Sequence, residues 1–159
     1  MIVFRLSKSR YSTDLSGKGA EKAGGRWNSK GVAMIYTSAS RALCMAEVAV
    51  HMPLGIVPAD YVLASIEIPD NSIMEISMQE LPADWQALPH PDSTQKLGDK
   101  FIREGKYLAL KVPSVVVQGE YNFLVNPKHE AIKEVRVKHT EPFMFDKRLF
   151  TFTFPDNPL

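Results

Sequence analysis

The chain is poor in cysteine, in net charge and in long apolar runs, and each shortage excludes a class of protein. Its one cysteine, Cys44, allows no intrachain disulfide, so the fold does not depend on oxidation. With 19 basic and 18 acidic residues the net charge is +1, which argues against a chain-wide affinity for nucleic acid or lipid. No signal-peptide pattern follows Met1, and the apolar region 42–50 is too short to span a bilayer. We therefore expect a cytoplasmic protein that contacts neither membrane nor nucleic acid directly.

Several motifs that hold cofactors or metals are also missing. The sequence has no P-loop and no GxGxxG for phosphate, and no GxSxG for a serine nucleophile. It has no HExxH and no CxxC, and its four histidines lack the spacing of metal ligands. These absences favour a chemistry that uses no metal and no bound cofactor.

The length and the order of elements predict one α+β domain over residues 1–159. A chain of 159 residues is typical of a single core. Short strands alternate irregularly with two or three helices, without βαβ units. We expect strands at 2–6, 32–37, 61–68, 73–76, 107–112, 115–117, 122–125, 135–137 and 143–152.

Two helices and one long loop complete the expected organisation. Residues 7–25 are polar and contain four glycines, which predicts a long loop. Ser38 or Ser40 is expected to cap a helix that runs to about Met52, and its apolar composition predicts that it is largely buried. A second helix is expected over 94–103, capped by Ser93 and ended by Gly105.

The run Gly24-Gly25-Arg26-Trp27-Asn28 is the first candidate site. Glycine allows another group to approach the backbone closely, and arginine is a permanent cation that binds phosphate oxygens at two points. The alternative is a hairpin with a surface arginine. Downstream, Tyr36 offers a ring face and a hydroxyl, or else serves as a core aromatic.

Glu47 stands out because its neighbours are apolar. A buried carboxylate costs several kcal/mol unless it is paired or hydrogen-bonded. Glu47 is therefore expected to face a cavity or to meet a cation, and Arg26 is a candidate partner. His51, one turn further along, is interpreted as a residue that ends the helix.

A second polar group lies in the C-terminal half. Ser114 interrupts an apolar run, and Asn122 and Asn126 flank another. A hydroxyl and two amides in a strand-turn-strand unit line a polar pocket, or else form turns by local hydrogen bonds.

Arg26, Glu47 and Ser114 stand in the order after which the RES domain is named. The surroundings resemble that family as well: Gly-Gly-Arg-Trp-Asn-x-x-Gly at 24–31, Tyr-Thr-x-x-Ser at 36–40, Ala-Glu-x-x-x-His at 46–51 and Pro-Ser-Val-Val-Val at 113–117. Tyr-Asn-Phe-Leu-Val-Asn-Pro follows at 121–127. The resemblance covers about residues 4–137 and implies a fold like that of the ADP-ribosyltransferases.

The resemblance also implies a function. Members are toxins of bacterial toxin–antitoxin pairs that break the nicotinamide–ribose bond of NAD+ by hydrolysis or phosphorolysis, and some transfer ADP-ribose to a protein. NAD+ is then a substrate, and no cofactor is implied. The implied partner is an Xre-like helix-turn-helix antitoxin that blocks the active site, and a homodimer within that complex is compatible. A non-catalytic antitoxin-binding module, with Arg26 and Glu47 as a buried ion pair, is the alternative.

By this resemblance, the catalytic residues are Arg26, Tyr36, Glu47 and Ser114. The NAD-binding residues that it implies are Arg26, Trp27, Tyr36, Ser38, Glu47, Ser114 and Asn122. Glu47 stabilises charge on the ribose, Tyr36 lies beside nicotinamide, and Arg26 holds the diphosphate or ribose. Trp27 contributes its backbone, and the loop 7–25 closes over NAD+.

Overall fold

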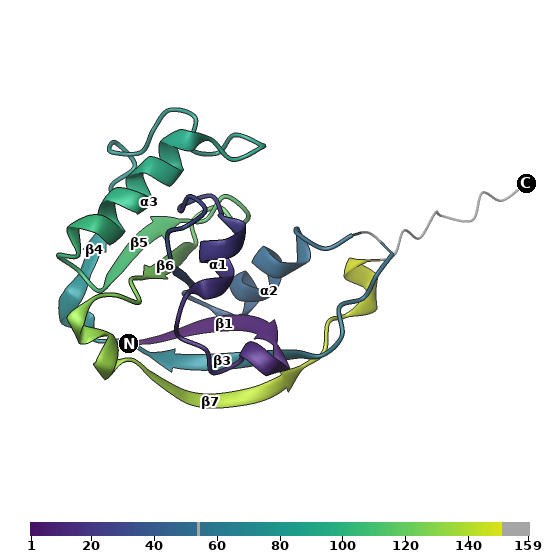
Figure 1. Ribbon diagram of the computed structural model, residues 1–159. Helices are drawn as coiled ribbons and strands as arrows, with labels where there is room; N and C mark the ends of the chain where they lie inside the picture. The colour runs from purple at the N-terminus through teal and green to yellow at the C-terminus, as the bar shows by residue number, and fades with distance from the viewer. Residues whose placement is uncertain (54, 151–159) are drawn as a thin grey trace, which may run out of the picture.

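One seven-stranded sheet organises the computed structural model, which describes residues 1–53 and 55–150 (Figure 1). The strand order is β4-β5-β6-β2-β1-β3-β7, and only the β4–β5 pair is parallel. The strands are β1 (Ile2–Lys8), β2 (Ile35–Ser38), β3 (Tyr61–Glu67), β4 (Ile73–Glu75), β5 (Ala109–Pro113), β6 (Tyr121–Val125) and β7 (Arg136–Phe143). A mixed sheet with few helices confirms the predicted α+β class.

Within the described residues, three α-helices accompany the sheet: α1 (Lys18–Ala23), α2 (Arg41–Ala49) and α3 (Asp92–Glu104). Short 3₁₀ helices lie at Ser9–Tyr11, Asp70–Ser72, Glu130–Glu134 and Lys147–Leu149. In the described part of the chain, no helix is long and apolar enough to cross a membrane.

Helix ends follow local hydrogen bonding, in part as predicted. Ser40 caps α2, because its side chain accepts from the Leu43 amide, as expected. Gly105 ends α3 in the left-handed conformation, also as expected. The predicted cap at Ser93 is wrong, because α3 begins at Asp92 and the Ser93 hydroxyl donates to Asp84 instead.

Three sequence predictions about the elements are wrong. Residues 7–25 are not one loop, since β1 continues to Lys8 and α1 lies within the segment. Residues 115–117 form a turn rather than a strand, because the Val116 and Val117 amides both bind the Ser114 hydroxyl. The strand expected at 143–152 is also wrong: β7 ends at Phe143, and 151–152 lie outside the described residues.

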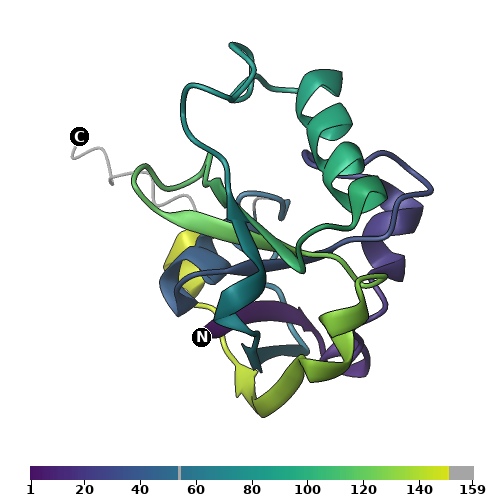
Figure 2. The ribbon, with the colours of Figure 1, turned by 90° about the vertical axis from the view of Figure 1, so that its left-hand side faces the viewer.

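The helices pack against the sheet in two separate places. In Figure 2, α1 and α3 lie to the right and α2 lies to the left. Phe101 of α3 packs in a core cluster with Trp27 and Met34, whereas Cys44 of α2 packs with Leu6 of β1. The clusters under α2 and α3 are thus separate, and a third cluster, which includes Val3 of β1 and Ile35 of β2, lies on the opposite face of these strands.

The central strands β1 and β2 are poorly joined to each other. They share a single register pair, Phe4 with Ser38, although β1 pairs with β3 and β2 pairs with β6 along their full lengths. Beyond Phe4, β1 and β2 therefore have no backbone pairing with each other. This interruption in the middle of the sheet positions the candidate site.

Candidate active site

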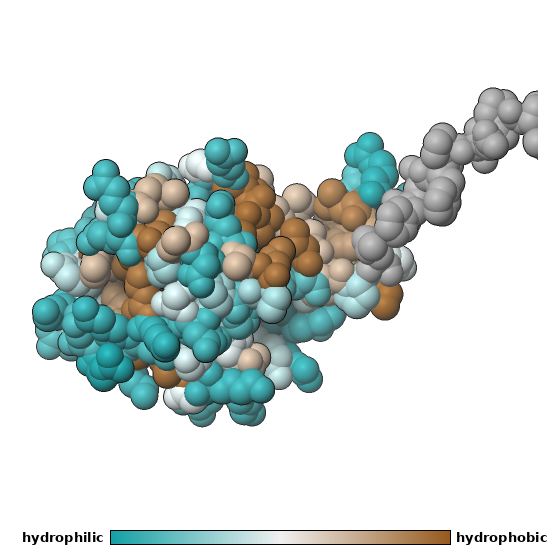
Figure 3. Space-filling model, turned by 90° about the horizontal axis from the view of Figure 1, so that it is seen from above, coloured by the Kyte–Doolittle hydropathy of each residue, from teal (hydrophilic) through white to brown (hydrophobic). Residues whose placement is uncertain are grey.

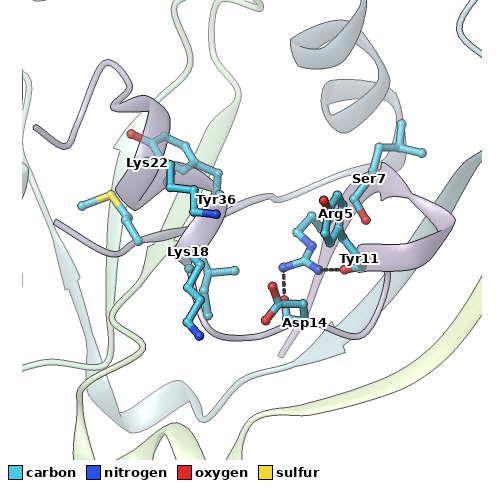
Figure 4. Close-up of a pocket in the computed structure, with 13 residues that line it drawn as sticks. Arg5, Ser7, Tyr11, Asp14, Lys18, Lys22 and Tyr36 are labelled. Atoms are coloured by element: carbon cyan, nitrogen blue, oxygen red, sulfur yellow. Dashed lines mark hydrogen bonds between the residues drawn. The ribbon is translucent and has the colours of Figure 1, made fainter. Parts of the chain in front are cut away.

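Two adjoining cavities occupy the region where β1 and β2 separate. The larger has a volume of about 460 Å³ and the smaller about 220 Å³. Both are lined by Arg5, Leu6 and Tyr36, so these side chains form their common border. Figure 4 shows the larger cavity, with Arg5 and Tyr36 on opposite sides of it. Together they form a cleft of the size that small-molecule ligands occupy.

Glu47 is held at the smaller cavity by two hydrogen bonds. Its Oε1 accepts from the Asn122 amide at 2.6 Å and from the Ser114 hydroxyl at 2.8 Å. The Asn122 carbonyl oxygen in turn accepts from the Ser38 hydroxyl at 2.7 Å. The ends of β2, β5 and β6, which are neighbours in the sheet, supply these three partners. The structure thus brings together four of the residues predicted from the sequence.

The Ser114 hydroxyl has a defined orientation. It accepts from the amides of Val116 and Val117, each at 3.0 Å, so its own proton is left for Glu47. The turn chemistry and the polar pocket, which the sequence left as alternatives for Ser114, therefore occur together. Asn126 is not part of this group, because it lies buried at the opposite end of β6 and binds Lys128 and Ile102.

The second carboxylate oxygen of Glu47 is available for a ligand. Over residues 1–53 and 55–150, no hydrogen bond is formed to Oε2, while Glu47 lines the cavity. The prediction that its helix is largely buried is wrong. Only Leu43 and Cys44 of α2 are buried, because the helix packs on the sheet with one side and leaves the other open. Glu47 lies at the border between the two sides.

Tyr36 forms the opposite side of the smaller cavity and is fixed by its hydroxyl. That hydroxyl donates to Asn28 Oδ1 at 2.7 Å and accepts from the Trp27 amide at 3.1 Å. Burial raises the pKa of Tyr36 well above its ordinary value, so the phenol stays neutral. Asn28, which is fully buried, also donates to the carbonyls of Ala20 and Val32.

The second residue of the double glycine must be glycine for a steric reason. A Cβ on Gly25 would lie 2.7 Å from the Tyr36 hydroxyl oxygen and 3.0 Å from Asn28 Oδ1. Only glycine leaves room for the hydrogen bond between these two side chains. Two residues further along, Trp27 buries its indole in the core, and its backbone amide donates to the Tyr36 hydroxyl.

Arg26 does not pair with Glu47. Its guanidinium donates to the carbonyls of Trp85 at 2.6 Å and Ala87 at 3.1 Å, and no Arg26–Glu47 ion pair occurs in the described part of the chain. The pKa of Arg26 is lowered by burial, and the field of Glu47 opposes this effect, so the two groups still interact at longer range. The Arg26–Glu47 ion pair that the sequence suggested is therefore wrong.

Arg5 is the arginine that lines both cavities, and the sequence analysis missed it. Its terminal nitrogens donate to the carbonyls of Tyr11 and Asp14, as Figure 4 shows. Its Nε is buried without a partner, and so is the hydroxyl of Ser7, which lines the larger cavity. The sequence feature that could have identified Arg5 is a cation within a run of apolar residues. Burial lowers the pKa of Arg5, so the charge is held there at an energetic cost.

The remaining groups of the cleft define its charge. Lys18 and Lys22 of α1 and Asp14 line the larger cavity, so cations exceed anions there. In the smaller cavity, burial raises the pKa of the Cys44 thiol to about 11, so it is neutral. Among the described residues, no group of three His, Cys, Asp or Glu side chains forms a candidate metal site.

Comparisons with known proteins find relatives over most of the chain. The family model of the RES domain matches residues 2–146. "Toxin Res" of Yersinia enterocolitica is 37% identical over 152 residues, which cover 94% of this chain and 99% of the relative. "Prs ADP-ribosylating toxin" of a Sphingobium species is 36% identical over 146 residues, covering 90% and 91% of the two chains.

A solved structure shows the same fold. A chain of the M. tuberculosis MbcT–MbcA toxin–antitoxin complex superposes with a TM-score of 0.71 at 20% identity, covering 94% of this chain and 86% of that one. Fold likeness and the family match over nearly all of the sequence lead to one assignment. The chain belongs to the RES domain family.

Proposed function

We propose that this chain is the toxin of a toxin–antitoxin pair and that it depletes NAD+ by breaking the nicotinamide–ribose bond, with water or phosphate as acceptor. One observation carries the proposal. Ser114 and Asn122 hold one oxygen of the Glu47 carboxylate, and the other has no partner among the described residues, at a cavity that adjoins a second, cationic one. The names of the relatives, "Toxin Res" and "Prs ADP-ribosylating toxin", support the toxin assignment.

Glu47 has the geometry needed to stabilise a sugar cation. As nicotinamide leaves, positive charge develops on the ribose, as in glycoside cleavage. A carboxylate held in place before the reaction stabilises that charge without reorganising. Two donors on Oε1 prevent rotation of the carboxylate and leave Oε2 for the ribose hydroxyls. Ser38 acts through Asn122, whose amide it orients.

The other parts of NAD+ are matched to side chains of the two cavities by their chemistry. The neutral ring of Tyr36 lies between the cavities and suits an apolar contact with nicotinamide. Arg5, with an unpaired Nε, and the lysines of α1 suit the diphosphate in the larger cavity. Contacts of Arg26 and of the Trp27 backbone with NAD+ stay predictions from the family resemblance.

Consumption of NAD+ by the purified protein tests this function. The expected result is loss of NAD+ with release of nicotinamide, together with ADP-ribose in plain buffer or a phosphorylated ADP-ribose in phosphate. Arg5→Gln is expected to raise the KM for NAD+ by about tenfold or more, since a charge-assisted hydrogen bond contributes about 1.5–3 kcal/mol. Arg10→Gln, which changes a cation outside both cavities, is the matched control. If wild type leaves NAD+ intact with and without phosphate, the proposal fails.

Transfer of ADP-ribose to a protein is a second candidate function. The relative named "Prs ADP-ribosylating toxin" is similar over 90% of this chain, which favours it. Labelled NAD+ added with cell extract distinguishes the two functions. A labelled protein band favours transfer, whereas label found only in free ADP-ribose favours NAD+ depletion. The non-catalytic alternative depended on an Arg26–Glu47 ion pair, and the described residues contain none.

The proposed partner is an Xre-like antitoxin that covers the cleft. The structural neighbour comes from a toxin–antitoxin complex, which supports a partner of this kind. Val50, Ile56 and Val57 are exposed beside the end of α2, close in sequence to Glu47 and His51. Figure 3 shows hydrophobic side chains in patches on one face of the molecule, a feature typical of interaction surfaces. Co-purification with the product of an adjacent helix-turn-helix gene, with loss of NAD+ consumption, is the expected result.

A further inference from the structure

His51 lines the same small cavity as Glu47, although the sequence indicated only a residue that ends the helix. It follows α2 and is exposed to solvent. Its ring Nδ1 lies 2.7 Å from the backbone carbonyl oxygen of Glu47, and its amide donates to the Val48 carbonyl at 3.1 Å. One hydrogen bond thus holds the imidazole and another holds the backbone of His51, at the cavity that Glu47 also lines.

The contact with a carbonyl determines the tautomer of His51. A carbonyl oxygen only accepts hydrogen bonds, so Nδ1 must carry the proton in the neutral ring. The other nitrogen, Nε2, then holds a free lone pair. Within residues 1–53 and 55–150, no hydrogen bond to Nε2 is formed. Capping a carbonyl in the last turn of α2 accounts for Nδ1 alone. It gives no role to Nε2, although the His51 side chain lines the same cavity as Glu47.

The other titratable groups of the cavity are unsuited to accept a proton. They come from three elements: Arg5 of β1, Tyr36 of β2, and Cys44 and Glu47 of α2. Arg5 is a cation. Burial raises the pKa values of Tyr36 and Cys44, so both already hold their protons near neutral pH. Glu47 has one oxygen engaged by two donors, and the proposed function assigns the other to the ribose.

We propose that Nε2 of His51 is the general base that activates water for attack on the ribose. This inference rests on the proposed function. The C–N bond between ribose and nicotinamide breaks, and its electron pair leaves with the ring nitrogen, which becomes neutral. The water oxygen bonds to C1 of the ribose, and the proton that it loses goes to Nε2. The products are ADP-ribose and nicotinamide, and the exposed imidazolium then releases one proton to solvent.

Substitution of His51 by asparagine separates this role from capping. The amide of His51→Asn retains a donor near the position of Nδ1 but has no basic nitrogen. Hydrolysis by this variant is expected to fall about 10²-fold in kcat or more, the size typical of general base catalysis, with KM unchanged. The acidic limb of the pH–rate profile is expected to disappear, and added imidazole to restore part of the rate. His139→Asn, exposed on β7 outside the cavity, is the matched control.

Phosphate provides a second readout, because a phosphate anion attacks without losing a proton to a base. In phosphate buffer, His51→Asn is therefore expected to form relatively more phosphorylated ADP-ribose and less ADP-ribose than wild type. A purely structural role of His51 would lower both products equally. If His51→Asn folds poorly, the same product ratio and imidazole rescue are measured on His51→Gln.

The outcomes separate this inference from the proposed function. A His51→Asn enzyme that hydrolyses NAD+ at the wild-type rate with an unchanged pH profile overturns the role of His51 and leaves NAD+ cleavage intact. Wild-type enzyme that forms only the phosphorylated product also overturns it. Wild-type enzyme that consumes no NAD+ under any condition overturns the proposed function itself.

Discussion

Asn122 donates a hydrogen bond of 2.6 Å to Glu47, although 75 residues separate the two in the sequence. The bond joins the last turn of α2 to strand β6 and fixes one oxygen of the carboxylate. Asn122 is itself oriented by Ser38, its register partner on β2. A chain of hydrogen bonds from the sheet to Glu47 is therefore part of the fold.

Removing the Ser114 hydroxyl is expected to lower catalysis more than substrate binding. Ser114→Ala deletes a hydrogen bond to a charged group, which contributes about 1.5–3 kcal/mol, so kcat for NAD+ loss should fall about 10- to 100-fold. Steady-state kinetics with released nicotinamide as the signal measures this effect. Ser93→Ala, whose hydroxyl binds Asp84 away from the cleft, should keep wild-type kinetics. Equal rates for both variants would contradict the role of Ser114.

Adding one methyl group at Gly25 is expected to displace Tyr36. A Cβ there would lie 2.7 Å from the Tyr36 hydroxyl oxygen, so the hydrogen bond to Asn28 must break or move. The free energy of unfolding of Gly25→Ala should fall by about 1–3 kcal/mol, and NAD+ loss should fall with it. Gly19→Ala, with nothing near its Cβ position, should retain the free energy of unfolding of wild type. Denaturant melts and activity of the two variants decide the matter.

Gly98 is expected to be intolerant of any side chain, for a reason unrelated to catalysis. A Cβ on this residue would lie 1.8 Å from the Trp27 carbonyl oxygen, so α3 must move away from the backbone next to Arg26. Gly98→Ala should lower the free energy of unfolding by about 1–3 kcal/mol, measured in urea. Lys96→Ala, exposed on the same helix, should stay within about 0.5 kcal/mol of wild type. A wild-type midpoint for Gly98→Ala would refute this close packing.

The buried thiol of Cys44 predicts a loss of stability in alkali. Burial raises its pKa to about 11 from an ordinary value of 9.0, so the folded chain keeps a proton that the unfolded chain releases. The free energy of unfolding should therefore be unaffected below about pH 8 and should fall between pH 9 and 11, by about 2–3 kcal/mol from this group. In Cys44→Ala this part of the pH dependence should vanish. A decline just as steep in the variant would show that other groups cause it.

The sequence predicted the chemical groups of the site better than their pairing. Glu47, Ser114, Asn122 and Ser38 were all predicted, and the structure joins them in one chain of hydrogen bonds. The assignment of Arg26 to Glu47 was wrong, because the carbonyls that hold Arg26 belong to residues about 60 positions away in an irregular segment. Local sequence carries no signal for such a contact.

Arg5 and α1 were missed for a different reason. An arginine inside a short strand is usually an exposed residue, and its position at the cleft depends on the separation of β1 from β2 after one register pair. Helix α1 has six residues, too few for a periodic pattern, and three glycines lie within it or adjoin it. Tertiary contacts stabilise it, since Asn28 and Gly31 bind its backbone carbonyls.

The most direct test of the central claim is the rate of NAD+ loss by Glu47→Gln. The glutamine amide oxygen still accepts from Ser114 and Asn122, so the variant should fold and melt like wild type, while the charge at Oε2 is lost. Glu75→Gln, which removes a carboxylate from the distant edge strand β4, is the control. We predict that kcat falls about 10²–10³-fold in Glu47→Gln and is unchanged in Glu75→Gln. A folded Glu47→Gln protein that consumes NAD+ as fast as wild type would contradict the proposed role of Glu47.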